Sequence, residues 1–97
     1  MKLLALERDP DGALRTAASS EMLRAEAATA WELHQSGFLR ELYFRADHHR
    51  AVLVLECESL DEARRRLEEL PLVREGVVDF EVIPLVAYPG FARLFAP

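Results

Sequence analysis

Two β-rich runs at the centre of the chain constrain its fold more than any other feature. Residues 39–46 and 51–57 are rich in aliphatic, aromatic and β-branched side chains, and four polar residues, 47–50, separate them. A polar turn of this length between two such runs predicts an antiparallel hairpin. We therefore expect two adjacent antiparallel strands in the middle of the chain.

The predicted hairpin has one apolar face and one mixed face. With Ala46 opposite Ala51, the apolar face pairs Phe44 with Leu53 and Leu42 with Leu55. The mixed face pairs Arg45 with Val52, Tyr43 with Val54 and Glu41 with Glu56. The apolar face belongs under a layer of helices. The mixed face is too polar for a dry core and too aromatic for a fully wet surface, so we expect a second surface to cover it.

Helical patterns flank the hairpin on both sides. Before it, Ser19, Ser20 and Glu21 form a predicted N-cap followed by an acid in the first turn, and Gly37 is a predicted stop. The predicted buried stripe of this helix is Leu23, Ala27, Ala30, Trp31 and His34. After the hairpin, Ser59 and Glu62 form a capping box and Pro71 stops the helix. The predicted buried stripe of this second helix is Leu60, Ala63, Leu67 and Leu70.

Two further β-type runs complete the pattern. Residues 3–6 form a short apolar run that ends in a turn at 7–12, and residues 77–85 alternate as a strand does. Pro84 indicates that this last strand lies at an edge of the sheet or ends there. The order βαββαβ predicts one α+β domain over residues 1–97 of the ferredoxin-like type, a four-stranded antiparallel sheet with two helices on one face.

The size and the C-terminal residues of the chain both favour association with a second copy. A domain of 97 residues buries a modest share of its surface, so a sheet face lent to a partner adds stability. Residues 86–97 form an unusually aromatic tail, which we expect to pack over its own sheet edge or over a neighbouring subunit. A homodimer is the expected assembly.

Composition argues against several classes of function. With 17 acidic against 12 basic residues, the chain is not expected to bind nucleic acid. The single cysteine, Cys57, cannot form an internal disulfide, and Asp47, His48 and His49 splay apart in a turn, so no metal site is expected. No apolar run approaches the roughly 20 residues of a membrane span or resembles a leader, so we expect a cytoplasmic protein.

Five blocks of sequence carry a resemblance to a known family: residues 31–37, 39–45, 51–56, 70–73 and 88–91. Together they resemble the muconolactone isomerase-like proteins of the dimeric α/β-barrel superfamily. The resemblance implies that two such sheets face each other to form a barrel, in a homodimer or a larger homo-oligomer. It also implies isomerase-type proton transfer, without a cofactor, on a small lactone from the degradation of aromatic compounds.

The predicted pair Glu41 and Glu56 is the first candidate for such chemistry. Two close carboxylates cannot both ionise cheaply, so the pKa of one should rise and suit it to act as a base near neutral pH. Arg45 and Tyr43, on the same face, are the expected donors to the charge that develops on the substrate oxygen. The alternative is that these groups form an ion-pair network at a subunit interface, with Arg45 or Arg40 neutralising the acids.

The end of the first helix supplies further candidates. His34 could act as an acid or base in a pocket between helix and sheet, and Trp31 and Arg40 are candidate substrate-binding residues. Structural roles are open as well. His34 could be a core residue or a cation near the helix C-terminus, and Trp31 a packing residue.

Three functions stay open at this point. The first is a cofactor-free enzyme of the isomerase type, with Glu56, Glu41 or His34 as its base. The second is a non-catalytic module that binds a small molecule or closes an oligomer, which the lack of a decisive catalytic signature favours. The third, a cofactor-free monooxygenase, rests on the superfamily resemblance alone. None of the three is expected to use a cofactor.

Overall fold

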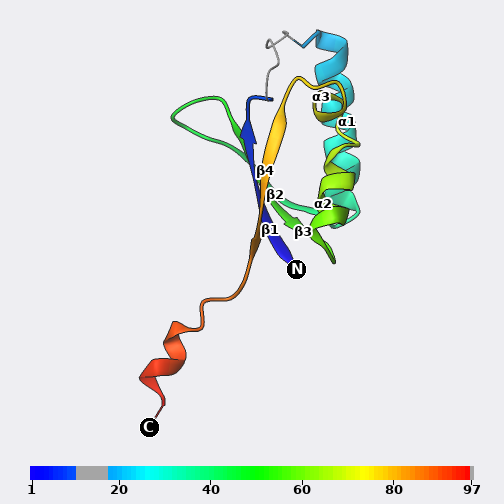
Figure 1. Ribbon diagram of the computed structural model, residues 1–97. Coiled ribbons are helices and arrows are strands. Elements are labelled where there is room, and N and C mark those ends of the chain that lie inside the picture. The colour runs from blue at the N-terminus through cyan, green and yellow to red at the C-terminus, as the bar shows by residue number, and fades with distance from the viewer. Residues whose placement is uncertain (11–17, 97) are drawn as a thin grey trace.

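The computed structural model of the chain describes residues 1–10 and 18–96. Its helices and strands follow the predicted order βαββαβ, with two short helical segments added (Figure 1). The elements are β1 (Lys2–Arg8), α1 (Ser20–Gln35), β2 (Leu39–Phe44), β3 (Ala51–Glu56), α2 (Leu60–Leu67), α3 (Pro71–Arg74), β4 (Asp79–Leu85) and the 3₁₀ helix η1 (Gly90–Leu94). The predicted turn at residues 11 and 12 lies outside the described residues.

The four strands form one antiparallel sheet in the order β2-β3-β1-β4. The helices α1, α2 and α3 lie together on one side of this sheet (Figure 1). This arrangement confirms the predicted α+β, ferredoxin-like fold. The strand β4 is an edge strand, as Pro84 predicts, because a proline there removes no hydrogen bond from the interior of the sheet.

The predicted register of the hairpin, with Phe44 opposite Leu53, is wrong by two residues. Phe44 lies opposite Ala51, and a bulge between Leu39 and Glu41 follows further along. The reason is that the turn closes earlier than expected, with the Arg45 amide donating to the Arg50 carbonyl at 2.8 Å. Side chains alternate between the two faces of a strand, so a shift of two residues leaves each side chain on its predicted face. The residue that lies opposite it on the other strand changes.

The helix α2 packs as the sequence predicts. The Ser59 hydroxyl accepts from the Glu62 amide at 3.1 Å, and Ala63, Leu67 and Leu70 are at most 2% exposed. Glu62 does not close a reciprocal capping box, because its carboxylate accepts from the Glu58 amide instead. The chain leaves α2 at Leu67, so the predicted stop Pro71 begins α3 rather than ending α2.

The helix α1 begins and ends as predicted but does not bury the predicted stripe. The Ser19 hydroxyl accepts from the Met22 amide at 3.1 Å, and Gly37 takes a positive φ of 88° just beyond the end of the helix. The fully buried residue of α1 is Leu33, which the predicted stripe omits. Leu23 is 51% exposed and Trp31 62% exposed, and His34 is exposed as well.

The hydrophobic core lies between the helices and one face of the sheet. The sheet contributes Leu3, Ala5, Leu39, Leu53 and Leu55, and they contact buried side chains from the helix layer and its connections. The opposite face of the sheet, called the open face here, carries no helix (Figure 1). No helix among residues 1–10 and 18–96 is long and apolar enough to span a membrane.

The chain beyond β4 extends away from the rest of the molecule (Figure 1). Residues 86–96, called the C-terminal arm here, carry Val86 at 95% exposure and Phe95 at 84%. The predicted packing of this segment over its own sheet edge is therefore wrong. The alternative, packing over a neighbouring subunit, stays a prediction.

Candidate active site

A cleft lies between α1 and the helix-covered face of the sheet, at the end where β1 finishes and β4 begins. This cleft has a volume of about 770 Å³. Its walls are mainly apolar and include Leu23, Ala27 and Ala30 from α1 and Leu42, Phe44 and Phe80 from the sheet. The volume and the apolar walls are those of a site for a small organic molecule.

The cleft explains why the stripe of α1 is less buried than predicted. Leu23, Ala27 and Ala30 do face the sheet, as their helical spacing requires, but they face it across the open cleft. Trp31 and His34 are not among the residues that line it. The predicted periodicity of the first three residues is therefore right, whereas the predicted burial is not.

The carboxylate of Glu26 is the main polar group in the wall of the cleft. One of its oxygens, Oε1, accepts a hydrogen bond from the Leu72 amide of α3 at 3.0 Å. The second oxygen accepts none from residues 1–10 or 18–96. Burial against the apolar walls raises the pKa of Glu26, and the charge of Glu7 raises it further, although the Leu72 amide and Arg74 act in the opposite direction.

A second carboxylate and an imidazole also line the cleft. Oε1 of Glu7, on β1, accepts from the Ala51 amide at 3.0 Å. His49, in the turn between β2 and β3, stacks on Phe44 with ring centroids 4.1 Å apart. The cleft thus combines a half-buried acid, a second acid and an imidazole with apolar walls, which is the composition that proton transfer requires.

The structure does not bring the predicted pair Glu41 and Glu56 together. Glu41 lies opposite Val54 because the hairpin closes early, and its carboxylate accepts from the Tyr43 hydroxyl at 2.7 Å. This hydrogen bond raises the pKa of Tyr43 and keeps its phenol protonated. Oε1 of Glu56 is 3.1 Å from the amino group of Met1.

Arg45, the predicted donor of the open face, is also paired locally. Its guanidinium donates two hydrogen bonds to Asp47, at 2.9 and 2.6 Å, and these lower the pKa of Asp47 to about 2. Both side chains are largely exposed. The observed pairing agrees with an ion-pair role for Arg45 and does not aim its charge at Glu41 or Glu56.

The candidates at the end of α1 lie outside the cleft. Nδ1 of His34 is 2.7 Å from the Leu39 carbonyl, and its ring lies 6.2 Å from that of Trp31. Nε of Arg40 donates to the Gly37 carbonyl at 2.6 Å. These contacts tie the end of α1 to the start of β2. They do not form the predicted pocket between helix and sheet.

The prediction from sequence missed Glu26, although a signal for it was present. Glu26 follows Leu23 by three residues and precedes Ala30 by four, so it interrupts the apolar stripe of α1. A single acid on an otherwise apolar helix face marks either a buried structural contact or a site. Glu7 and His49 gave no such signal, because Glu7 falls at the end of a strand and His49 in a turn, each next to polar residues.

A four-stranded antiparallel sheet covered on one face, with an apolar cleft that holds a half-buried carboxylate, defines a small ferredoxin-like α+β protein with a ligand-sized site. A model of the muconolactone delta-isomerase family matches residues 7–90, and the chain belongs to this family. The chain is similar to the crystal structure of muconolactone isomerase, at 22% sequence identity and a TM-score of 0.73 over 92% of each chain, which shows a shared fold. No curated protein matches the chain.

Proposed function

We propose that this protein catalyses cofactor-free proton transfer on a small lactone in the cleft beside α1, with Glu26 as the base. The half-burial of Glu26 in an apolar wall is the observation that carries the proposal, since a base needs a tuned pKa and a dry surrounding. Membership of the muconolactone delta-isomerase family supports a lactone as the substrate class.

The proposed reaction moves one proton and leaves the enzyme unchanged. Glu26 removes a proton from the carbon that follows the double bond conjugated with the lactone carbonyl, and the electron pair passes through that double bond to the carbonyl oxygen as a dienolate. The protonated Glu26 then returns the proton to another carbon of the conjugated system, which shifts the double bond and regenerates the carboxylate. A raised pKa suits both halves, because the same group must first take the proton and then give it back.

The enolate oxygen requires a hydrogen-bond donor while it carries charge. Within the same chain, His49 is the imidazole at the cleft, and its stacking on Phe44 fixes the plane of the ring. Tyr43 also lines the cleft, but its hydroxyl donates to Glu41. His49 is therefore the donor that we propose from this chain.

The test is the conversion of muconolactone, followed by ultraviolet absorbance, in wild-type protein and in Glu26→Gln. The amide keeps the size and the Leu72 contact of Glu26 but cannot accept the proton, so we expect turnover to fall by about 10²–10⁴-fold. Glu32→Gln, an exposed acid on the same helix, is the matched control and should keep full turnover. Full turnover in a folded Glu26→Gln variant would exclude Glu26 as the base.

The open face is the rival location, and we propose that it forms an interface. Its apolar side chains Leu4, Leu6, Val52, Val54 and Ile83 are half-buried in one chain, and a second copy of the face would cover them. Glu41, Glu56, Arg45 and Tyr43 would then lie within a barrel formed by two sheets. Loss of turnover in Arg45→Ala or Glu56→Gln, with Glu26→Gln active, would move the site to this face.

Binding without catalysis is the alternative that the cleft also supports. A lactone that occupies the native cleft raises the melting temperature by mass action, whether or not it reacts. A screen of lactones and phenolic acids against neutral controls therefore separates the two functions. A rise in melting temperature with no product would assign the cleft to binding alone, and oxygen consumption with a quinol would indicate the monooxygenase instead.

A further inference from the structure

Glu7 is a carboxylate that the alternation of β1 places on the helix-covered face of the sheet. It follows Leu3 and Ala5 at a spacing of two residues, and both of these side chains are fully buried in the core. Glu7 continues the same face but is only half-buried, because it lines the cleft instead of the packed interior. Its Oε1 accepts from the Ala51 amide at 3.0 Å, which holds the carboxylate in the wall.

Glu7 acts through its charge on the other acid of the cleft. The charge of Glu7 raises the pKa of Glu26, so the two carboxylates lie close enough to repel each other. An anionic group of a ligand in the cleft meets the same repulsion. His49 is the imidazole among the described lining residues, and even in its protonated form it balances one charge of two.

Two arginines act on the cleft acids from outside the cleft. The charge of Arg74 is felt by Glu26 and that of Arg50 by Glu7, but neither arginine lines the cleft. Nη2 of Arg50 donates to Asp9 at 3.0 Å, and Nε of Arg74 lies 3.6 Å from Oε1 of Glu75. Each guanidinium is therefore balanced by an acid beside it and is not directed at a ligand.

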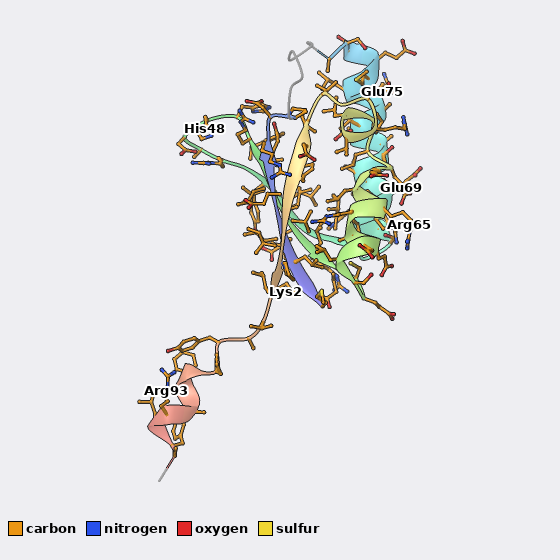
Figure 2. All side chains as sticks on the ribbon, viewed as in Figure 1. Lys2, His48, Arg65, Glu69, Glu75 and Arg93 are labelled. Carbon is orange, nitrogen blue, oxygen red and sulfur yellow. The ribbon has the colours of Figure 1, made fainter. Side chains whose placement is uncertain are left out.

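The walls of the cleft favour an uncharged ligand. The described residues that line it include no lysine or arginine, and Figure 2 shows Lys2, the only lysine of the sequence, toward the opposite end of the sheet from His48. A ligand carboxylate would lose its hydration against apolar side chains such as Leu42 and Phe80. The volume of about 770 Å³ is in the range of pockets that bury drug-sized ligands, roughly 300–1,000 Å³. It leaves room for an apolar group beside a lactone ring.

We propose that Glu7 selects the substrate by charge, and that the substrate is an uncharged lactone with an apolar substituent. A carboxylate on the substrate would lie in an apolar wall beside two acids, whereas an alkyl or ester group in its place enters that wall at little cost. Glu7 is then a specificity residue, and Glu26 remains the base. This inference rests on the proposed function for the reaction, whereas selection of the ligand by charge does not.

Muconolactone and its methyl ester test the selection, because the free acid carries a carboxylate beside the lactone ring and the ester does not. We expect the kcat/KM of the wild-type protein to be about tenfold higher for the ester, since the free acid adds a like charge to a half-buried site. Ultraviolet absorbance follows both reactions. A wild-type ratio of ester to acid at or below one would overturn the inference.

Glu7→Gln separates the charge from the apolar character of the ester. The glutamine keeps a side-chain oxygen for the Ala51 amide but carries no charge, so the ratio of ester to acid should decrease severalfold. Loss of Glu7 also changes the pKa of Glu26, but both substrates react through Glu26, so this change cancels in the ratio. Glu32→Gln, an exposed acid of α1, should keep the wild-type ratio. An unchanged ratio in a folded Glu7→Gln variant would overturn the role of Glu7.

Saturated forms of the same two lactones test the selection without relying on turnover. They have no double bond to shift, so a rise in melting temperature reports binding alone. The ester should raise the melting temperature of the wild-type protein more than the acid does, and Glu7→Gln should narrow this difference. That pattern, with no turnover of either unsaturated lactone, would retain the charge selection and reject the proposed function. Turnover that depends on Glu26 but prefers the free acid would retain the proposed function and reject the inference.

Discussion

The helices α1 and α2 carry similar apolar stripes and lie on the same face of the sheet, but only α2 buries its stripe. Ala63 and Leu67 of α2 are at most 2% exposed and contact the core directly. Leu23 and Ala27 of α1 face the sheet across a cleft of about 770 Å³. The same helical spacing thus stabilises the fold at one end of the helix layer and forms the wall of a site at the other.

The difference between the two helices separates a packed interior at α2 from an open cleft at α1. A side chain of α2 loses contact with water on folding, so its removal leaves a cavity in a packed interior. A side chain at the cleft already has space on one side, so its removal changes the site more than the fold. The helices therefore differ in what a truncation should cost, and the predictions below measure that difference.

The largest expected effect is on the α2 side. Leu67→Ala removes a side chain that is 2% exposed, so we expect the free energy of unfolding to fall by about 2–5 kcal/mol. Urea unfolding followed by circular dichroism gives this value. A decrease in the free energy of unfolding below about 1 kcal/mol would show that side chains of α2 are packed as loosely as those at the cleft. The two helices would then not differ in packing.

The matched truncation at the cleft is expected to have a smaller effect on stability. Leu23→Ala removes a side chain that is 51% exposed, so the free energy of unfolding should fall by less than about 1 kcal/mol. The same change should raise the KM for muconolactone more than it lowers kcat, because Leu23 forms the wall and not the reacting group. Equal destabilisation by Leu67→Ala and Leu23→Ala would contradict the comparison.

The sequence could predict the fold because its signals are local. Hairpin patterns, the N-caps Ser19 and Ser59 and the stop at Gly37 each depend on a few neighbouring residues, and all are found in the structure. The pairing of Glu41 with Glu56 was wrong because register depends on where the turn closes, and Arg45 and Arg50 close it one residue early. A small error in register leaves the fold intact but moves every cross-strand pair.

The site was harder to predict than the fold because it depends on space that the chain leaves empty. Periodicity indicates which side of α1 faces the sheet, but it does not indicate whether the helix and the sheet touch there. Burial in the cleft raises the pKa of Glu26, the Leu72 amide lowers it and the charge of Glu7 raises it, and these two residues are 46 and 19 positions away in sequence. The aromatic residues of the C-terminal arm, in contrast, were noticed in the sequence. They predicted that the arm packs on a surface, but they did not indicate which surface.

The smallest expected effect concerns the stability of the cleft end as a function of pH. Burial raises the pKa of Glu26 above its ordinary value of 4.5, so the folded chain binds this proton more tightly than the unfolded chain does. The contribution of Glu26 to stability is therefore fully present below pH 4.5 and is lost as the pH rises through the raised pKa. Above that point the ionised carboxylate lowers the stability of the native state.

A glutamine at this position cannot ionise, which makes the pH effect measurable. Relative to wild type, Glu26→Gln should therefore become more stable as the pH rises from 4 to 7, by less than about 1 kcal/mol because Glu26 is only half-buried. Urea unfolding of both proteins at the two pH values checks this, with Glu32→Gln as the control for loss of a charge from α1. A difference that stays constant with pH, or that reverses its sign, would mean that the cleft is open enough for water to solvate Glu26, and the dry surrounding that the proposed base requires would be absent.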